Sequence, residues 1–206
     1  NTKRIVFPDY SKRLAEFYGI MLGDGNLTKI KGYKIGTYMI RIVGDSRYDK
    51  DYLKYFVKPL IEKLFKIEVK IGKFKKQNAM FIQAHSIELT KFLEKIEFKA
   101  GNKIENRLGI PSWILNDKYY LIACIRGLFD TDGSVYKLTN QNCYQINFSN
   151  KNNRLLNEVR NSLVSLGIKA SNISKGKEIY ITKKSEIRKF LKLIGFHNSK
   201  HLNKVK

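Results

Sequence analysis

Two short segments of the sequence contain the residues best suited to catalysis. The segment 14–25 ends in Asp-Gly with its acid at Asp24, and the segment 122–133 ends in the same way at Asp132. Two carboxylates brought together supply hard oxygen ligands, which suit Mg²⁺ because this ion keeps several waters and accepts further oxygens from phosphate. A divalent ion held in this way can stabilise the attacking and leaving oxygens of phosphodiester hydrolysis. The repeated dipeptide therefore predicts a shared metal site, provided that the fold brings the two segments together.

A helix through each segment would place small residues in one stripe at positions i, i+4 and i+8. The two stripes consist of Ala15, Gly19 and Gly23, and of Ala123, Gly127 and Thr131. Small residues let two helix backbones approach closely, so the matching stripes predict that the helices pack about a pseudo-twofold axis. Each carboxylate would then lie at the negative end of a helix macrodipole, where a cation would relieve the cost. We expect Gly25 and Gly133 to be C′ residues with positive φ.

The same order of elements follows each segment and completes an αββαββα repeat. Alternating apolar and polar residues predict strands over Tyr33–Gly44, Glu68–Phe74, Cys143–Ser149 and Lys169–Ser174. Apolar residues at helical spacing predict helices over Lys50–Phe65 and Asn152–Leu166. Asn116 or Asp117 is the expected N-cap of the second repeated helix. Turn residues near 99–112 mark the join. We therefore expect an α+β fold of two halves, residues 1–105 and 106–206.

The charge of the chain points to a polyanionic partner. Its 206 residues include 40 Lys+Arg against 18 Asp+Glu, a net charge of +22, while 43% apolar residues suffice for a core. Two cysteines cannot form a disulfide framework or a four-thiolate zinc site. We find no apolar run long enough to span a membrane and no signal peptide at the start of the sequence, so we expect an intracellular protein without a membrane partner.

The segments 17–25 (FYGIMLGDG) and 125–133 (IRGLFDTDG) resemble the two motifs of a single-chain LAGLIDADG homing endonuclease. The resemblance implies two saddle-shaped antiparallel sheets with the motif helices packed at the interface. It also implies a monomeric, intron-encoded enzyme that cuts both strands of a long DNA target with Mg²⁺, for which Mn²⁺ can substitute, and leaves short 3′ overhangs. Asp24 and Asp132 are the implied catalytic metal ligands, joined by the residues directly before them, Gly23 and Thr131. Asp130 receives no metal role.

The resembled family often carries a basic or amide residue just after the second strand of each half, where it positions the attacking water. Lys151 is our candidate in the second half. The first half reads Val-Gly-Asp-Ser over 43–46, so Arg47 or Lys50 would have to substitute. This departure predicts that the two DNA strands are cut at different rates.

DNA contacts are expected on the polar faces of the strands and in the turns between them. Strand alternation points five side chains away from the core, and Arg, Asn and Gln can read base edges: Arg41, Lys70, Gln83, Gln145 and Asn147. Lysines in or near turns are better placed for phosphates, and we assign Lys29, Lys31, Lys34, Lys73, Lys75, Lys137, Lys175 and Lys177.

Two other interpretations stay open. The same fold and charge would serve a catalytically weak DNA-binding regulator or a maturase that binds intron RNA, although the presence of both acids favours the enzyme. His197 and His201 have the i, i+4 spacing of metal ligands, but no cysteine or carboxylate pattern completes such a site, so we interpret them as structural.

Overall fold

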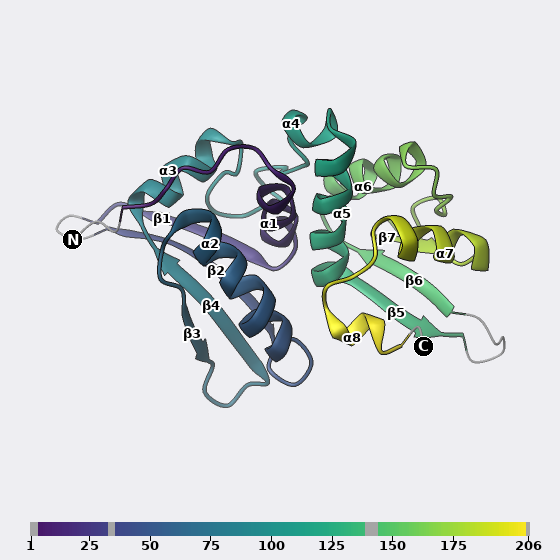
Figure 1. Ribbon diagram of the computed structural model, residues 1–206, viewed down its shortest axis with the longest axis horizontal. Coiled ribbons are helices and arrows are strands. Elements are labelled where there is room, and N and C mark those ends of the chain that lie inside the picture. Colours follow the sequence, from purple (N-terminus) through teal and green to yellow (C-terminus); the bar gives the residue numbers. More distant parts are fainter. Residues whose placement is uncertain (1–3, 33–35, 139–143, 205–206) are drawn as a thin grey trace.

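The computed structural model describes residues 4–32, 36–138 and 144–204 and contains two α+β halves that meet along a pair of central helices (Figure 1). The first half contains α1 (Lys12–Gly23), β1 (Gly25–Ile30), β2 (Thr37–Asp45), η1 (Tyr52–Val57, a π-helix), α2 (Lys58–Phe65), β3 (Lys70–Lys73), β4 (Ala79–His85) and α3 (Ile87–Lys95). A short helix, α4 (Ser112–Leu115), lies in the link. The second half contains α5 (Lys118–Asp132), β5 (Gly133–Lys137), β6 (Tyr144–Ser149), α6 (Asn153–Ser165), β7 (Glu178–Ile181), α7 (Lys184–Leu193) and α8 (Ser199–Leu202).

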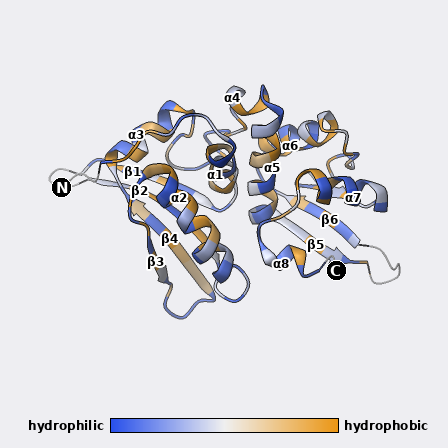
Figure 2. Ribbon diagram, viewed as in Figure 1, coloured by the Kyte–Doolittle hydropathy of each residue, from blue (hydrophilic) through white to orange (hydrophobic). Residues whose placement is uncertain are grey.

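Each half has one antiparallel sheet, so the expected α+β class is confirmed. The strand orders are β1-β2-β4-β3 in the first half and β5-β6-β7 in the second. The two sheets lie on opposite sides of the α1–α5 pair (Figure 1). Hydrophobic and hydrophilic residues share helices such as α7 (Figure 2), which buries Ile187 and Phe190 against its own half.

The strand expected over Lys169–Ser174 does not form. Within the described residues, this segment makes an isolated bridge from Ser174 to Glu178 and a further backbone hydrogen bond from Ser171 N to Tyr180 O at 2.8 Å, without forming a ladder. Side chains take over backbone groups that a ladder would need: Ser171 Oγ accepts from Tyr180 N at 3.0 Å, and Arg160 Nε donates to Ser171 O at 3.0 Å. Short polar side chains compete with sheet hydrogen bonds in this way, so the second sheet has one strand fewer than expected.

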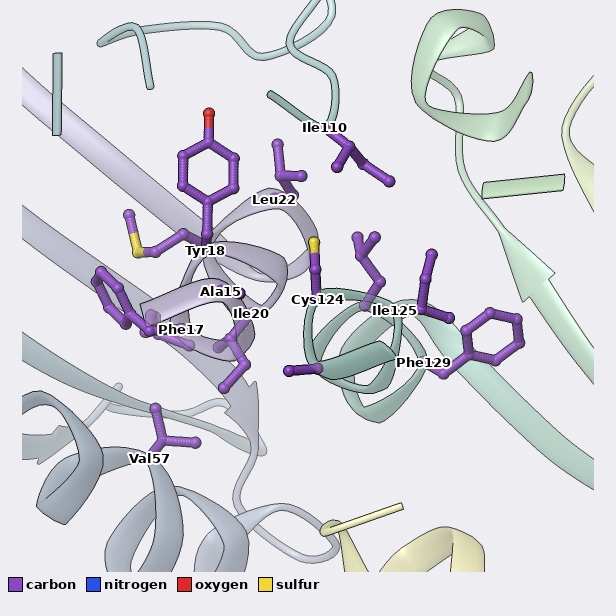
Figure 3. Packing of buried hydrophobic residues seen from close by; sticks show 14 of the residues in the cluster. Ala15, Phe17, Tyr18, Ile20, Leu22, Val57, Ile110, Cys124, Ile125 and Phe129 are labelled. Carbon is purple, nitrogen blue, oxygen red and sulfur yellow. The ribbon is translucent and has the colours of Figure 1, made fainter. Parts of the chain in front are cut away.

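The stripes of small residues lie where α1 and α5 meet, as the sequence predicts. A Cβ built on Gly19 would lie 2.1 Å from the carbonyl oxygen of Cys124. A Cβ on Gly127 would lie 2.4 Å from the carbonyl oxygen of Glu16. Both helices are buried along most of their length, and Figure 3 shows Ile20 and Cys124 on their facing sides. The backbones therefore touch, and no larger side chain fits at these positions.

The glycines that follow the two acids do not have the expected positive φ. Gly133 has φ −83°, and Gly25 also lies outside the positive range. Each glycine is instead required by a close approach to the preceding helical turn. A Cβ on Gly25 would lie 2.5 Å from Met21 Cα, and one on Gly133 would lie 2.2 Å from Phe129 O.

The ends of the central helices are fixed by side-chain caps. Ser11 Oγ accepts from Leu14 N at the start of α1, and Asp117 accepts from the backbone N–H groups of Tyr119 and Tyr120 at the start of α5. Asp117 is thus one of the two N-caps expected. Among the described helices, none is both long enough and apolar enough to cross a membrane.

The helix contact generates a test by substitution of a central glycine. We expect Gly19→Ala to lower the free energy of unfolding by about 2 kcal/mol, because the methyl group would overlap backbone rather than a movable side chain. Urea denaturation measures this change. If helix propensity alone mattered, alanine would instead stabilise the protein by about 1 kcal/mol, so a gain in stability would contradict the packing.

Gly109→Ala is the control for this substitution. The atoms nearest to a Cβ at Gly109 are the ends of two long side chains, Glu158 and Arg154. The loss of stability should be smaller than at Gly19, since these ends can move aside.

Candidate active site

The two repeated acids converge at one end of the central helix pair. Asp24 is the C-cap of α1, and its backbone N–H donates to Ile20 O at 3.1 Å. Asp132 is the last residue of α5. The carboxyl carbon of Asp132 would lie 3.6 Å from a Cβ built on Gly23, so it lies against the final residue of α1.

The surroundings of both carboxyl groups disfavour their charged form. Burial, together with the nearby charge of Asp132, raises the pKa of Asp24 to about 7. Burial also raises the pKa of Asp132, while the amide of Asn150, which donates to Asp132 Oδ2 at 2.7 Å, lowers it. A pair of hard oxygen ligands that resists ionisation fits a divalent cation, which would favour the charged form of both acids.

The residues directly before the two acids already have hydrogen-bond partners. The carbonyl oxygen of Gly23 accepts a short hydrogen bond from Lys103 Nζ. The hydroxyl of Thr131 donates within its own helix, to Gly127 O at 3.0 Å and Leu128 O at 2.9 Å. A metal-ligand role for Gly23 and Thr131 stays a prediction.

Lys103, which the sequence reasoning missed, lies between the two helix ends. Its Nζ also donates to Leu22 O at 2.9 Å, so the ammonium group covers the carbonyl end of α1. This is the favourable place for a cation on a helix dipole. Burial lowers the pKa of Lys103, whereas the charges of Asp132 and Asp24 raise it.

Lys200 is a second lysine beside the acids that the sequence reasoning missed. Its positive charge lowers the pKa of both Asp24 and Asp132. Its Nζ lies 2.8 Å from Asp49 Oδ1. Lys103 and Lys200 each follow the last long helix of a half, α3 or α7, so they occupy related places in the repeat. An alignment of the two repeats that continued past α3 and α7 would have related Lys103 to Lys200.

The basic residues expected near the acids lie farther out. Lys151 is exposed at the edge of a cleft of about 370 Å³ that Gly23, Lys103, Asp132 and Asn150 also line. The side chain that contacts Asp132 is its neighbour Asn150. The catalytic role of Lys151 stays a prediction.

In the first half, neither suggested substitute takes the place of Lys151. Arg47 is exposed and pairs with Asp45, with Nη2 2.6 Å from Oδ2. Lys50 is exposed. The lysine that approaches Asp24 on this side is Lys200.

The first sheet carries a polar row along one face. Strand register places Asn26 opposite Arg41, Arg41 opposite Gln83, and Gln83 opposite Lys70. Gln83 Oε1 accepts from Arg41 Nε at 3.0 Å and Nη2 at 2.8 Å, and the guanidinium also lies 4.9 Å from the ring centre of Phe81. The Arg41–Gln83 pair at the centre of the row, between β2 and β4, is thus pre-ordered.

The second sheet is less open than expected. Gln145 points away from the core and donates to Thr182 Oγ1 at 2.7 Å. Asn147 lies on the same face but is only 8% exposed, because the register places it between Ser134 and the large Tyr180. A DNA contact by Asn147 stays a prediction, and it would require the neighbouring side chains to move aside.

Most of the turn lysines are exposed, as phosphate contacts require. Lys29 also pairs with Glu94, with Nζ 2.7 Å from Oε2. Lys34 lies outside the described residues. The other exposed members are Lys31, Lys73, Lys75, Lys137, Lys175 and Lys177.

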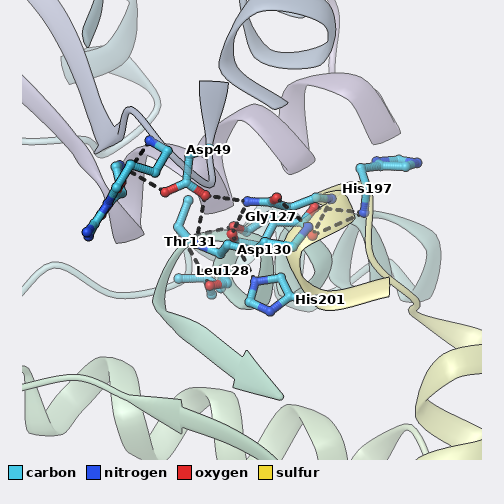
Figure 4. A network of polar contacts seen from close by, with 11 residues as sticks. Asp49, Gly127, Leu128, Asp130, Thr131, His197 and His201 are labelled. Atoms are coloured by element: carbon cyan, nitrogen blue, oxygen red, sulfur yellow. Dashed lines mark hydrogen bonds and ion pairs between the residues drawn. The ribbon is translucent and has the colours of Figure 1, made fainter. Parts of the chain in front are cut away.

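A second acidic cluster lies close to the first and includes His197. The possible ligand atoms of Glu16, Asp130 and His197 lie within 4.8 Å of one another. Their oxygens already have protein partners: Glu16 pairs with His197 Nδ1 at 2.6 Å and Arg126 Nη1 at 3.5 Å. The Asp130 carboxylate accepts from the backbone N–H groups of His197 and Asn198 (Figure 4). This arrangement ties the C-terminal segment to the central helices.

His201 does not join His197 in that cluster. His201 is 2% exposed, its ring centre lies 4.7 Å from that of Phe196, and its Nε2 lies 3.3 Å from Asp130 O. Burial lowers the pKa of His201 to about 4. The structural interpretation of the two histidines fits these contacts.

Comparison with known families assigns both halves to one group. Residues 15–108 match the WhiA LAGLIDADG-like domain, and residues 120–195 match the LAGLIDADG-like domain. No curated protein matches the chain. With both motifs, both family matches and the paired sheets in place, the chain is a two-motif LAGLIDADG protein.

Solved structures show the same fold. Mesophilic variants of the homing endonuclease I-DmoI match with a TM-score of 0.65 and 22% identity over 89% of this chain and 90% of theirs. I-DmoI in complex with DNA and Mn matches at 0.63 and 23% identity over 89% of this chain and 96% of that one. The N-terminal LAGLIDADG domain of DUF199/WhiA matches at 0.58 and 19% identity over 94% of this chain and 88% of that domain.

The raised pKa of Asp24 predicts how metal-free stability depends on pH. Its folded-state pKa of about 7 exceeds the ordinary value of 3.8, so the folded state keeps a proton that the unfolded state releases. Stability should therefore fall as pH rises between these values. In chelator at pH 8, we expect Asp24→Asn to raise the free energy of unfolding by on the order of 2 kcal/mol. The difference in the free energy of unfolding between Asp24→Asn and the wild type should disappear near pH 4.

Adding Mn²⁺ should reverse the order of stability of the wild-type protein and Asp24→Asn. The wild-type protein should gain thermal stability by mass action, whereas Asp24→Asn should gain little. Asp51→Asn, at an exposed acid, is the control and should follow the wild type. Equal stabilisation of all three proteins by Mn²⁺ would show that the ion binds elsewhere.

Proposed function

We propose that the protein is a site-specific endonuclease that hydrolyses both strands of a long duplex DNA target with a divalent metal and leaves short 3′ overhangs. The main support is the convergence of two partly buried carboxylates at the end of the central helices, each directly before the first strand of a sheet. Mg²⁺ is the expected ion, with Mn²⁺ as a substitute. One chain holds both acids, so a monomer suffices. An intracellular location and an intron-encoded gene remain part of the proposal.

The side chains around the two acids suggest a role for each in the proposed cleavage. Asp24 and Asp132 would hold the metal, which when bound would supply Lewis-acid stabilisation of the phosphate oxygens. Lys103 and Lys200 stand next to the acids, where an ammonium group can stabilise charge that develops on a phosphate. Asn150 orients the Asp132 carboxylate through the 2.7 Å hydrogen bond. Arg41 and Gln83 present paired donors and acceptors to base edges.

A DNA-binding protein without nuclease activity is the second candidate, together with an intron-RNA maturase. The observation that keeps it open is that the first half matches a different family model from the second. The shared fold therefore does not by itself fix the activity. A tighter specific Kd for intron RNA than for any duplex DNA would favour the maturase.

Cleavage of a randomised duplex library in low salt with Mg²⁺, followed by mapping of the cut ends, tests the proposed activity. We expect cuts in both strands offset by a few nucleotides. Asp24→Asn and Asp132→Asn should each reduce cleavage by about 10²-fold or more while duplex binding persists. Full cleavage by both variants would overturn the metal assignment.

Lys103→Met tests the lysine that the structure adds to the site. Loss of a donor that stabilises charge in the transition state should slow cleavage by about 10²-fold, with duplex Kd changed far less. Lys99→Met removes an exposed lysine nearby and the same charge, so it is the matched control. Equal rates for the two variants would remove Lys103 from the proposed machinery.

A further inference from the structure

The two half-sites differ at the end of the second strand. Gly25 pairs with Ile42 in the first sheet, and Gly133 pairs with Phe148 in the second. Counting two residues onward, Gly44 holds the position that Asn150 holds in the second half. Asn150 supports Asp132 with its amide, whereas the first half has no side chain at this position.

Asp49 fills the space beside Gly44. A Cβ built on Gly44 would lie 2.9 Å from Asp49 Cβ and 3.3 Å from Asp49 Oδ2. Asp49 is 7% exposed, and its Oδ2 accepts from Asp45 N at 3.0 Å. The glycine thus permits a third carboxylate to enter the first half-site, and this carboxylate raises the pKa of Asp24.

The other oxygen of Asp49 holds the C-terminal segment. Asp49 Oδ1 lies 2.8 Å from Lys200 Nζ and accepts from Asn198 Nδ2 at 2.8 Å. Asn198 is fully buried, and its amide also donates to Asp130 O at 3.1 Å. One carboxylate of the first half therefore contacts a segment of the second half at two points.

The ion pair with Asp49 fixes the position of the Lys200 ammonium group. Among the charges that lower the pKa of Asp24, Lys200 contributes more than Lys103. Lys103 interacts more strongly with the other acid, because Asp132 raises the pKa of Lys103 more than Asp24 does. Lys200, from the second half, thus has the larger electrostatic effect on Asp24 of the first half. The lysine near Asp24 is held by a carboxylate, while Lys103 is held by backbone carbonyls.

We propose that Asp49 is a positioning residue that places Lys200 beside Asp24 and so makes the two strand-cutting half-sites unequal. This inference rests on the proposed nuclease function for its catalytic consequence. The pairing itself does not, since it concerns the place of Lys200 in the DNA-free protein.

The pairing is tested first without DNA. Asp49→Asn keeps an oxygen for Asn198 but removes the charge that holds Lys200. Acylation of lysines with an N-hydroxysuccinimide ester, followed residue by residue with mass spectrometry, should show Lys200 reacting about threefold or more faster. Asp51→Asn removes a nearby exposed charge and should leave the rate unchanged. An unchanged rate in Asp49→Asn would overturn the positioning role.

The consequence for the half-sites is tested with a duplex carrying a different label on each strand. Asp49→Asn and Lys200→Met should slow the cut of the same strand by about tenfold, and the other strand should be cut at the wild-type rate. The double variant should be no slower than Lys200→Met alone, because residues that act as a unit are not additive. Asp51→Asn should cut both strands normally.

A merely structural role would give a different pattern. Equal slowing of both strands, together with a lower Tm, would overturn the proposal. If the wild-type protein cuts no duplex at all, the proposed function fails, while the acylation rates of Lys200 still decide whether Asp49 positions it.

Discussion

The direct contact of two helix backbones is the constraint on which the rest of the structure depends. Gly19 and Gly127 leave no room for a methyl group, and each carbonyl oxygen that they face belongs to the other helix. Because the helices touch, their final residues lie together, and the carboxylates that terminate them share one small region. The sheets that begin directly after these acids are then carried outward on both sides (Figure 1).

This close approach concentrates charge, and much of the surrounding structure compensates for it. Desolvation raises the pKa of Asp24 and Asp132, and two lysines from segments outside the sheets partly offset the cost. The C-terminal segment is bound by Glu16, Asp130 and Asp49, which belong to both halves. A protein with a net charge of +22 thus carries a small acidic centre inside a basic surface, which is the arrangement that a metal bridging to phosphate needs.

Repetition made the centre predictable from the sequence. Asp24 and Asp132 stood out because each ends a stripe of small residues, and the same local pattern in both halves specified helix packing. Side chains that depend on contacts between distant segments were harder to predict. Lys103 lies in a turn and Lys200 in the four-residue helix α8, which is too short to show a period, and only their places after α3 and α7 relate them. Asn147 follows strand alternation correctly, yet Tyr180, from a strand far along the chain, covers it. The lost strand near Ser171 likewise reflects side chains that took its backbone partners.

The most direct test of the metal centre is anomalous diffraction from a crystal of the duplex complex grown with Mn²⁺. We expect an anomalous peak within about 2.2 Å of carboxylate oxygens from both Asp24 and Asp132. A peak at Glu16, Asp130 and His197 with none between the two helix ends would contradict it.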